Sequence, residues 1–151
     1  GRIARERYFV GTAQGKLLAV DLKDGRLAWS YDCGDKIVSP PTVDSEWVIV
    51  SGAKGKVHCL STDGAFKWSS ELTDTIQPET DGVIFRNHFF IGTKKGVILA
   101  IDVWTGRPVW QFTTVGYSEK EPRGVLANGI VSKGRFFLGC EDHFFYCFTL
   151  D

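Results

Sequence analysis

The stretch "AIDVWTGRPVW", residues 100–110, holds an apolar run ending in aspartate, a turn with glycine, and a tryptophan. The stretch "AVDLKDGRLAW", residues 19–29, has the same layout about eighty residues earlier. Recurrence of one short unit along a chain is typical of solenoids and propellers. The repeat therefore decides the fold, and two further copies accompany this pair.

The four copies align on one small residue in each unit. The copies cover residues 8–29, 47–68, 88–110 and 135–151, and the aligned small residues are Ala19, Cys59, Ala100 and Cys147. Each copy starts with an aromatic and β-branched run, such as "YFVGT" or "HFFIGT", which is typical of a strand. That run is the expected second strand of the unit, and a glycine turn, an apolar third strand, a second glycine turn and a tryptophan-bearing fourth strand follow in the complete copies. Candidate first strands lie upstream of the second and third copies, in residues 36–43 and 75–84. A four-stranded antiparallel meander of this length is one propeller blade.

The pattern predicts an all-β fold of β-propeller blades, about four of them, in a partial or half ring. The expected blades cover residues 1–32, 36–72, 75–114 and 119–151 of a single propeller segment. The first copy is expected to lack its first strand, and the last to stop at Asp151 before its fourth.

These residues resemble the PQQ-like repeat, or tryptophan-docking motif, of the quinoprotein alcohol dehydrogenase-like β-propellers. The motif is roughly A-x-D-x-x-T-G-x-x-x-W, and residues 100–110 match it in full. Residues 19–29 match with Asp24 in the threonine position. The second copy departs from the motif, with Cys59 for alanine and Ser61 for aspartate, and the fourth breaks off at the turn.

The resemblance implies that the tryptophan of one blade packs against the glycine turn of its neighbour. Indole is a large flat apolar plate with one donor, and glycine lets it approach the backbone closely. The implied docking residues are structural rather than ligand-binding: Gly25, Trp29, Gly64, Trp68, Gly106 and Trp110. Asp21 and Asp102 are expected to cap turn N–H groups.

Four blades are fewer than the six to eight that the resemblance implies for a closed ring. Leaving one blade face of roughly 250 Å² wet forgoes about 6 kcal/mol of hydrophobic stabilisation, against a domain stability of about 5–15 kcal/mol. The remaining blades of a longer parent protein, a second copy closing the ring, or a larger assembly would each solve this. The chain has no methionine and opens at Gly1, so we expect a segment of a longer parent.

The composition excludes several classes of partner. The formal net charge is zero and no apolar run is long enough to span a bilayer, so we expect no nucleic acid partner and no membrane span. Four cysteines without C-x-x-C spacing are expected to be free thiols, although a Cys140–Cys147 bridge across a hairpin stays open.

Catalytic motifs are absent from the sequence, and His58, His88 and His143 lie in different copies. We therefore expect no catalytic residue, no metal site and no cofactor. The alternative that the resemblance carries is PQQ with Ca²⁺, as in the quinoprotein dehydrogenases, although the adjacent cysteine pair of several such enzymes is missing here.

Two surface features are candidate partner-binding sites. The hairpin tips carry a basic group that we expect on one face, namely Lys16, Lys54, Lys56, Lys94 and Lys95. The longest connection, residues 114–134, carries Tyr117, Glu119, Lys120 and Arg123, and long insertions in repeat proteins often form binding loops. Solvated turns without a partner are the alternative interpretation of both features.

The sequence therefore predicts a non-catalytic scaffold or protein-interaction module of a larger protein. A fragment of a PQQ-dependent quinoprotein dehydrogenase is the alternative. By resemblance, two parents are open: the periplasmic outer-membrane assembly lipoproteins of bacteria, and the cytosolic propeller attached to some adenylate-forming enzymes. The unpaired thiols favour a cytoplasmic location over the periplasmic alternative.

Overall fold

The computed structural model describes residues 1–72, 80–115, 120, 123–125 and 128–149, and these residues are all β-structure, turns and loops without a helix. The all-β prediction is therefore confirmed over the described part of the chain. Accordingly, no helix among the described residues is long and apolar enough to cross a membrane. The chain divides into two compact units, residues 1–73 and 74–151.

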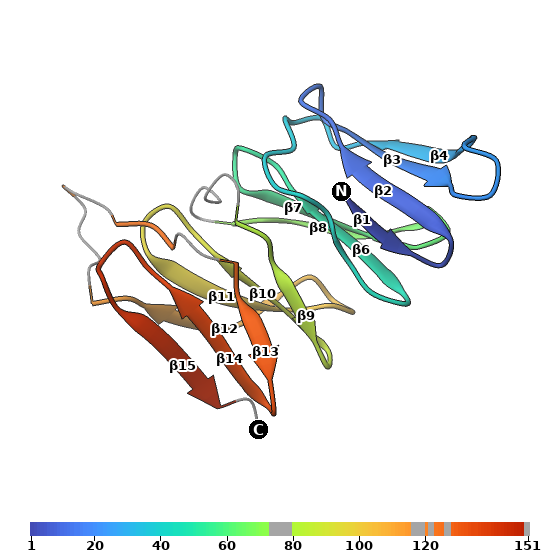
Figure 1. Ribbon diagram of the computed structural model, residues 1–151. Helices are drawn as coiled ribbons and strands as arrows, with labels where there is room; N and C mark the ends of the chain where they lie inside the picture. Colours follow the sequence, from blue (N-terminus) through green and yellow to red (C-terminus); the bar gives the residue numbers. More distant parts are fainter. Residues whose placement is uncertain (73–79, 116–119, 121–122, 126–127, 150–151) are drawn as a thin grey trace. The chain divides into compact units, whose positions relative to one another are not determined.

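The first unit contains two antiparallel sheets of four strands, each with its strands in sequence order (Figure 1). One sheet consists of β1 (Arg2–Ala4), β2 (Arg7–Gly11), β3 (Lys16–Asp21) and β4 (Leu27–Asp32). The other consists of β5 (Thr42–Val43), β6 (Trp47–Ser51), β7 (Lys56–Ser61) and β8 (Phe66–Glu71). Each sheet is a meander joined by tight turns, which is the blade expected from the repeat.

The second unit contains one sheet of four strands and one of three (Figure 1). The four-stranded sheet consists of β9 (Val83–Phe85), β10 (His88–Gly92), β11 (Val97–Asp102) and β12 (Pro108–Thr113). The last sheet consists of β13 (Ile130–Ser132), β14 (Arg135–Gly139) and β15 (Phe145–Thr149). Among the described residues, no fourth strand pairs with the outer edge of β15.

The strand register places the aligned small residue opposite the tryptophan in every complete copy. The pairs are Ala19 with Trp29, Cys59 with Trp68, and Ala100 with Trp110. A small side chain there leaves room for the indole on the neighbouring strand of the pleated surface. Immediately after each pair the register shifts by a bulge, which changes the local course of the edge strand.

Each unit has a hydrophobic core between its own two sheets. In the first unit this core includes Phe9, Leu17, Ala19, Val48 and Leu60. In the second unit it includes Phe90, Ile98, Ala100, Phe136 and Leu138. The same repeat positions recur in both cores, because strand alternation sends every second residue of β2, β3, β10 and β11 to the neighbouring sheet.

One sequence-based expectation is wrong, and one open alternative is resolved. The first copy does not lack its first strand, because Arg2–Ala4 pairs with β2 through Arg2–Phe9, Ile3–Tyr8 and Ala4–Arg7. A three-residue strand with an exposed arginine has no apolar run to reveal it. The four cysteines are free, and β15 pairs Cys147 with Phe137 rather than placing it beside Cys140.

Candidate functional site

The joint between the two sheets of the first unit is built around Trp29. Its indole lies flat against the β7–β8 turn, where a Cβ on Gly64 would stand only 2.8 Å from the indole Cγ. The indole Nε1 donates a hydrogen bond of 3.1 Å to the carbonyl oxygen of Thr62. Gly64 has a φ of +92°, which glycine adopts at low cost. Glycine is thus required at position 64 for two reasons: its backbone conformation has a positive φ, and the indole leaves no space for a Cβ.

Arg7 adds a second and charged connection at the same turn. Its Nη1 donates to the carbonyl oxygen of Thr62 at 2.9 Å and to Oδ1 of Asp63 at 3.0 Å. Arg7 and Trp29, which both belong to the first sheet, therefore donate hydrogen bonds to the same carbonyl oxygen of the second sheet. The carboxylate of Asp63 extends this contact towards solvent, where an ion pair contributes modestly.

A second joint recurs in both units, at the glycine that ends the second strand. A Cβ on Gly11 would collide with Ile37, the residue that bridges to Gly52 of the next sheet. A Cβ on Gly92 would collide with Val125, which bridges to Cys140 in the same way. The entering segment of each following sheet thus lies directly on a glycine of the preceding one.

A buried polar pair lies between the sheets of the first unit. The Tyr31 hydroxyl and His58 Nδ1 are 3.1 Å apart, and His58 is only 3% exposed. Nε2 of His58 has no hydrogen-bond partner among the described residues. Burial, and secondly the positive charge of Lys56, lower the pKa of His58. A neutral imidazole is therefore the form that this interface holds.

The equivalent place beside Trp110 in the second unit is an open groove of about 480 Å³. Trp110 is 40% exposed, and its ring meets the edge of Phe148 at a centroid distance of 5.2 Å. Arg86, His88 and Phe90 also line the groove. The groove combines an apolar surface with cationic and N–H donors, which suits a segment that presents carbonyl or carboxylate oxygens.

The remaining predicted docking residues are placed as follows. Gly25 follows β3 with a φ of +72°, and a Cβ there would meet nothing within 4 Å. Trp68 lies in β8 of the first unit, and Gly106 follows β11 of the second with a φ of +71°. The structure thus shows a filled joint at Trp29 and Gly64, and an open turn at Gly25.

The predicted basic residues belong to two different units. Lys16, Lys54 and Lys56 are in the first unit, where Lys54 and Lys56 line a shallow hollow with the carboxylates Asp35 and Glu71. The turn holding the exposed Lys94 and Lys95 is in the second unit.

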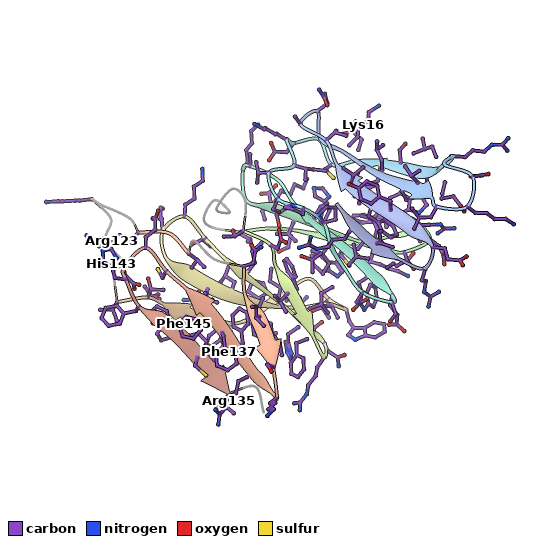
Figure 2. The ribbon with its side chains drawn as sticks, viewed as in Figure 1. Lys16, Arg123, Arg135, Phe137, His143 and Phe145 are labelled. Carbon is purple, nitrogen blue, oxygen red and sulfur yellow. The ribbon has the colours of Figure 1, made fainter. Side chains whose placement is uncertain are left out.

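In the second unit, the structure brings that lysine turn next to Arg123. A Cβ on Gly96 would lie 2.6 Å from the carbonyl oxygen of Arg123. Arg123 is exposed at the same end of the last sheet as His143, and Arg135 is at the other end (Figure 2). Lys120 is exposed as well, and Tyr117 and Glu119 lie outside the described residues.

The exposed face of the last sheet is aromatic. Phe137 and Phe145 lie side by side on it with ring centroids 6.1 Å apart, and Phe145 is 70% exposed (Figure 2). Tyr8 and Ile3 are exposed on the first sheet of the other unit. Such surfaces are typical of faces that another element covers.

Two buried thiols and one capping carboxylate have shifted pKa values. Burial raises the pKa of Cys33 to about 11 and that of Cys59 to about 12, so neither thiol is an activated nucleophile. Slight burial acts against ionisation of Asp102, but hydrogen bonds from Thr105 and Trp104 lower its pKa. Those bonds, of 2.8 and 3.0 Å, confirm that Asp102 caps the following turn.

PQQ with Ca²⁺, the alternative that the resemblance carries, would need oxygen ligands for the metal. No three His, Cys, Asp or Glu side chains gather in the described part of the chain as a metal site would require. Amide and backbone carbonyl oxygens also bind Ca²⁺, so PQQ with Ca²⁺ stays an untested alternative.

Sequence reasoning missed three contacts: Arg7 with Asp63, Tyr31 with His58, and Ile37 on Gly11. One of the three has a signal in the repeat, because Gly11 recurs as Gly92 and a hydrophobic residue follows at Ile37 and Val125. The Arg7 contact has none, since its position is held by His88 in the third copy.

Known proteins resemble this chain in sequence. BamB of Nitrosomonas eutropha is 31% identical over 120 residues, which is 77% of this chain and 28% of that protein. BamB of Shewanella oneidensis is 29% identical over 112 residues, which is 72% of this chain and 28% of that protein. The chain thus spans about 28% of the length of these curated relatives.

The crystal structure of BamB from Moraxella catarrhalis matches 96% of this chain and 43% of that one, with a TM-score of 0.79 and 22% identity. That likeness shows the propeller fold. A family profile described as "Outer membrane protein assembly factor BamB" matches residues 2–121, which include the tryptophan, glycine and strand positions of the first three sheets. Because this match covers most of the chain, the chain belongs to the BamB family of PQQ-like repeat β-propellers.

Proposed function

We propose that this chain is a non-catalytic scaffold segment of an outer membrane protein assembly factor, acting through protein–protein contacts on the periplasmic side. The observation that supports this most is the family match across residues 2–121, on a chain whose glycines and tryptophan serve joints between sheets. The relatives' name favours the periplasm over the cytoplasmic location that the free thiols suggested.

The remaining blades of a longer parent protein are part of this proposal. The relatives are more than three times as long as the matched segment, since it spans 28% of them. The exposed aromatic face with Phe137 and Phe145 supports a further sheet packing there. Covering such a face stabilises a sheet by burying apolar area at about 25 cal/mol per Å².

The basic end of the second unit is the contact surface that we propose for a protein partner. It consists of the Lys94–Lys95 turn and Arg123, with Lys120 exposed nearby in sequence. Arg123 donates weakly to the carbonyl oxygen of Glu141 at 3.5 Å, which leaves its charge uncompensated by that contact. A cationic surface of this kind steers an acidic partner and adds specificity more than raw affinity.

The experiment is a binding measurement against the purified outer membrane protein assembly machinery in detergent. The test variant is Lys94→Glu with Lys95→Glu and Arg123→Glu, and the matched control is Lys23→Glu with Arg26→Glu and Lys67→Glu in the first unit. We expect the parent chain to bind, the test variant to lose about tenfold or more in affinity, and the control to bind as the parent does.

Two outcomes would contradict the proposal. Absence of binding by the parent chain would remove the assembly role. Equal losses in the two triple variants would remove the basic end as the contact surface, because the effect would then follow from net charge alone.

A further inference from the structure

Three turns form the end of the second unit that lies opposite the basic end. In an antiparallel meander, the turn after the first strand and the turn after the third lie at the same end of the sheet. Here they are the β9–β10, β11–β12 and β13–β14 turns. The backbone N–H of Val103 donates to the carbonyl oxygen of Asn87 at 2.9 Å, and β9 contacts β13, so the turns are neighbours. Figure 2 shows Arg135, which follows the third turn, at the other end of the last sheet from Arg123. We call residues 86–87, 103–107 and 133–135 the Trp104 end.

The Trp104 end carries an excess of positive charge. Its exposed cations are Arg86, Arg107, Lys133 and Arg135. The neighbouring carboxylate of Asp102 accepts the backbone N–H groups of Trp104 and Thr105, at 3.0 and 2.8 Å, and so caps its own turn. None of the four cations forms an ion pair with a described carboxylate. The chain as a whole has zero formal net charge, so this cationic surface is a local feature.

The repeat shows that the first unit balances an equivalent cation. In the first copy Arg26 holds the position of Arg107, and its Nε lies 3.7 Å from Oδ2 of Asp24. The third copy has Thr105 in place of Asp24, and the Thr105 hydroxyl donates to Asp102 at 2.9 Å. Arg107 therefore lacks the carboxylate that accompanies Arg26.

The turn between the first and second strands shows the same change. Arg5 is followed by Glu6 in the first copy, whereas Arg86 is followed by Asn87 in the third and Lys133 by a glycine in the last. The backbone positions are equivalent, because Arg5, Arg86 and Lys133 have φ values of +46°, +52° and +48°. A basic residue thus recurs in this turn, and its acidic neighbour is replaced by an uncharged residue in the second unit.

Trp104 is the apolar part of this end. In the first copy its position is held by Lys23. Trp104 is 60% exposed, and neither it nor Arg107 lines the groove beside Trp110. Tryptophan is enriched at the level of lipid head groups, because its ring has an apolar body and one N–H donor. An exposed indole among unbalanced cations is therefore typical of a surface that meets lipid.

We propose that the Trp104 end binds an anionic lipid surface. The cations hold phosphate-bearing head groups, and Trp104 enters the head-group region. The placement favours lipid over an acidic protein segment. The cations occupy three separate turns rather than the walls of one groove, and an indole at a turn needs no pocket on a lipid surface. A basic cluster with an apolar anchor supplies the two signals that membrane association takes.

The experiment measures sedimentation of the full chain with vesicles of phosphatidylcholine and phosphatidylglycerol in equal parts, and with vesicles of phosphatidylcholine alone. The test variant is Arg86→Gln with Arg107→Gln, Lys133→Gln and Arg135→Gln. The matched control, with the same change in charge, is Arg5→Gln with Lys23→Gln, Arg26→Gln and Lys67→Gln in the first unit. We expect the parent and the control to bind the anionic vesicles alike. The test variant should bind at least about fiftyfold more weakly, since each basic residue near an anionic surface contributes about fivefold.

A second measurement tests the indole and does not depend on the folding of the quadruple variants. Phosphatidylcholine with brominated acyl chains quenches the fluorescence of indoles that enter the bilayer. We expect quenching of the parent on anionic vesicles, its loss in Trp104→Tyr, and its retention in the control Trp110→Tyr. Raising the salt from about 0.1 M to about 1 M should release the chain, because the Debye length falls from about 10 Å to about 3 Å.

Four outcomes would overturn the inference. A folded parent chain that does not sediment with the anionic vesicles would remove the lipid contact. Equal losses in the two quadruple variants would assign the binding to net charge alone. Quenching that persists in Trp104→Tyr would place another part of the chain at the membrane. Poly-glutamate that displaces the chain from the vesicles at equal charge concentration would make an acidic protein the partner. None of these results bears on the assembly role, because the vesicles contain no protein and every variant keeps the basic end.

Discussion

Trp29 and Trp110 occupy the same repeat position, opposite Ala19 and Ala100, but their surroundings differ. Trp29 is half-buried, covers Gly64 and has its N–H satisfied by Thr62. Trp110 is 40% exposed beside an open groove. The tryptophan therefore provides only half of the contact between two sheets, and the glycine turn of the neighbouring sheet provides the other half. Its energetic value depends on whether the neighbouring sheet brings a glycine turn to it.

The largest expected effect is the removal of the tryptophan from the filled joint. Trp29→Ala should destabilise the first unit by about 3 kcal/mol, because it opens a cavity and removes the indole hydrogen bond to the Thr62 carbonyl, which Arg7 still contacts. Trp110→Ala should cost about 1 kcal/mol or less, since much of that ring is already in water. Urea unfolding, with hydrogen exchange to separate the units, measures both. Equal losses would show that the groove matters as much as the joint.

The second prediction compares two costs of replacing a turn glycine: the steric clash of a new Cβ and the strain of a positive φ. Gly64 and Gly25 both have positive φ, but only Gly64 lies under an indole. Gly25→Ala should cost about 1 kcal/mol for the left-handed conformation, whereas Gly64→Ala should cost about 2–3 kcal/mol because the ring must also move. The same unfolding measurement applies. If the two variants were equally stable, the close approach of Trp29 would contribute nothing.

The third effect is a pH dependence confined to the first unit. The pKa of His58 lies below its ordinary 6.5, so the unfolded chain binds the proton more tightly than the folded unit does. Stability is therefore fully present above about pH 6.5 and falls as the pH drops towards the folded pKa. In the second unit Phe112 and Tyr146 hold the equivalent places, and burial raises the pKa of Tyr146.

Unfolding at pH 7.5 and pH 5.0 tests this, with His58→Gln as the control. Glutamine keeps a polar contact with Tyr31 and does not titrate. The parent should lose more stability on acidification than the variant, and hydrogen exchange should place the loss in β3 and β7 rather than in β11. A variant as acid-sensitive as the parent would assign the effect to carboxylates such as Asp35 instead.

Much of the fold could be predicted from the sequence because each copy of the repeat contains residues with strong local structural preferences. Aromatic runs, glycine turns and the recurring tryptophan give the strands and their order. The strand Arg2–Ala4 was missed because a short charged edge strand owes its place to pairing with β2, which is a tertiary contact rather than a local preference. The joint at Gly11 and Ile37 was missed for a similar reason, since it is made between sheets.

The candidate sites were harder to predict, because they depend on which turns meet. The lysines of the hairpin tips look alike in sequence, yet Lys54 and Lys56 lie among carboxylates, while the turn that carries Lys94 and Lys95 lies beside the backbone of Arg123. The residues around His58 and His88 in the sequence do not predict their different environments. His58 is buried against Tyr31, whereas His88 lines an open groove. Side-chain environment follows from packing between sheets, which a single copy of the repeat does not encode.

The smallest expected effect concerns the charged half of the filled joint. Arg7→Met should destabilise the first unit by about 0.5–1 kcal/mol, because the Asp63 side chain is 73% exposed and that ion pair is largely screened. His88→Met should be neutral, since no turn meets it in the described part of the second unit. Raising the salt concentration separates the two bonds of Arg7: the part due to Asp63 should disappear at about 1 M salt, and the part due to the Thr62 carbonyl should remain. A loss that is unchanged by salt would make the carbonyl bond the whole contribution, and the aspartate before the glycine would then serve the turn rather than the joint.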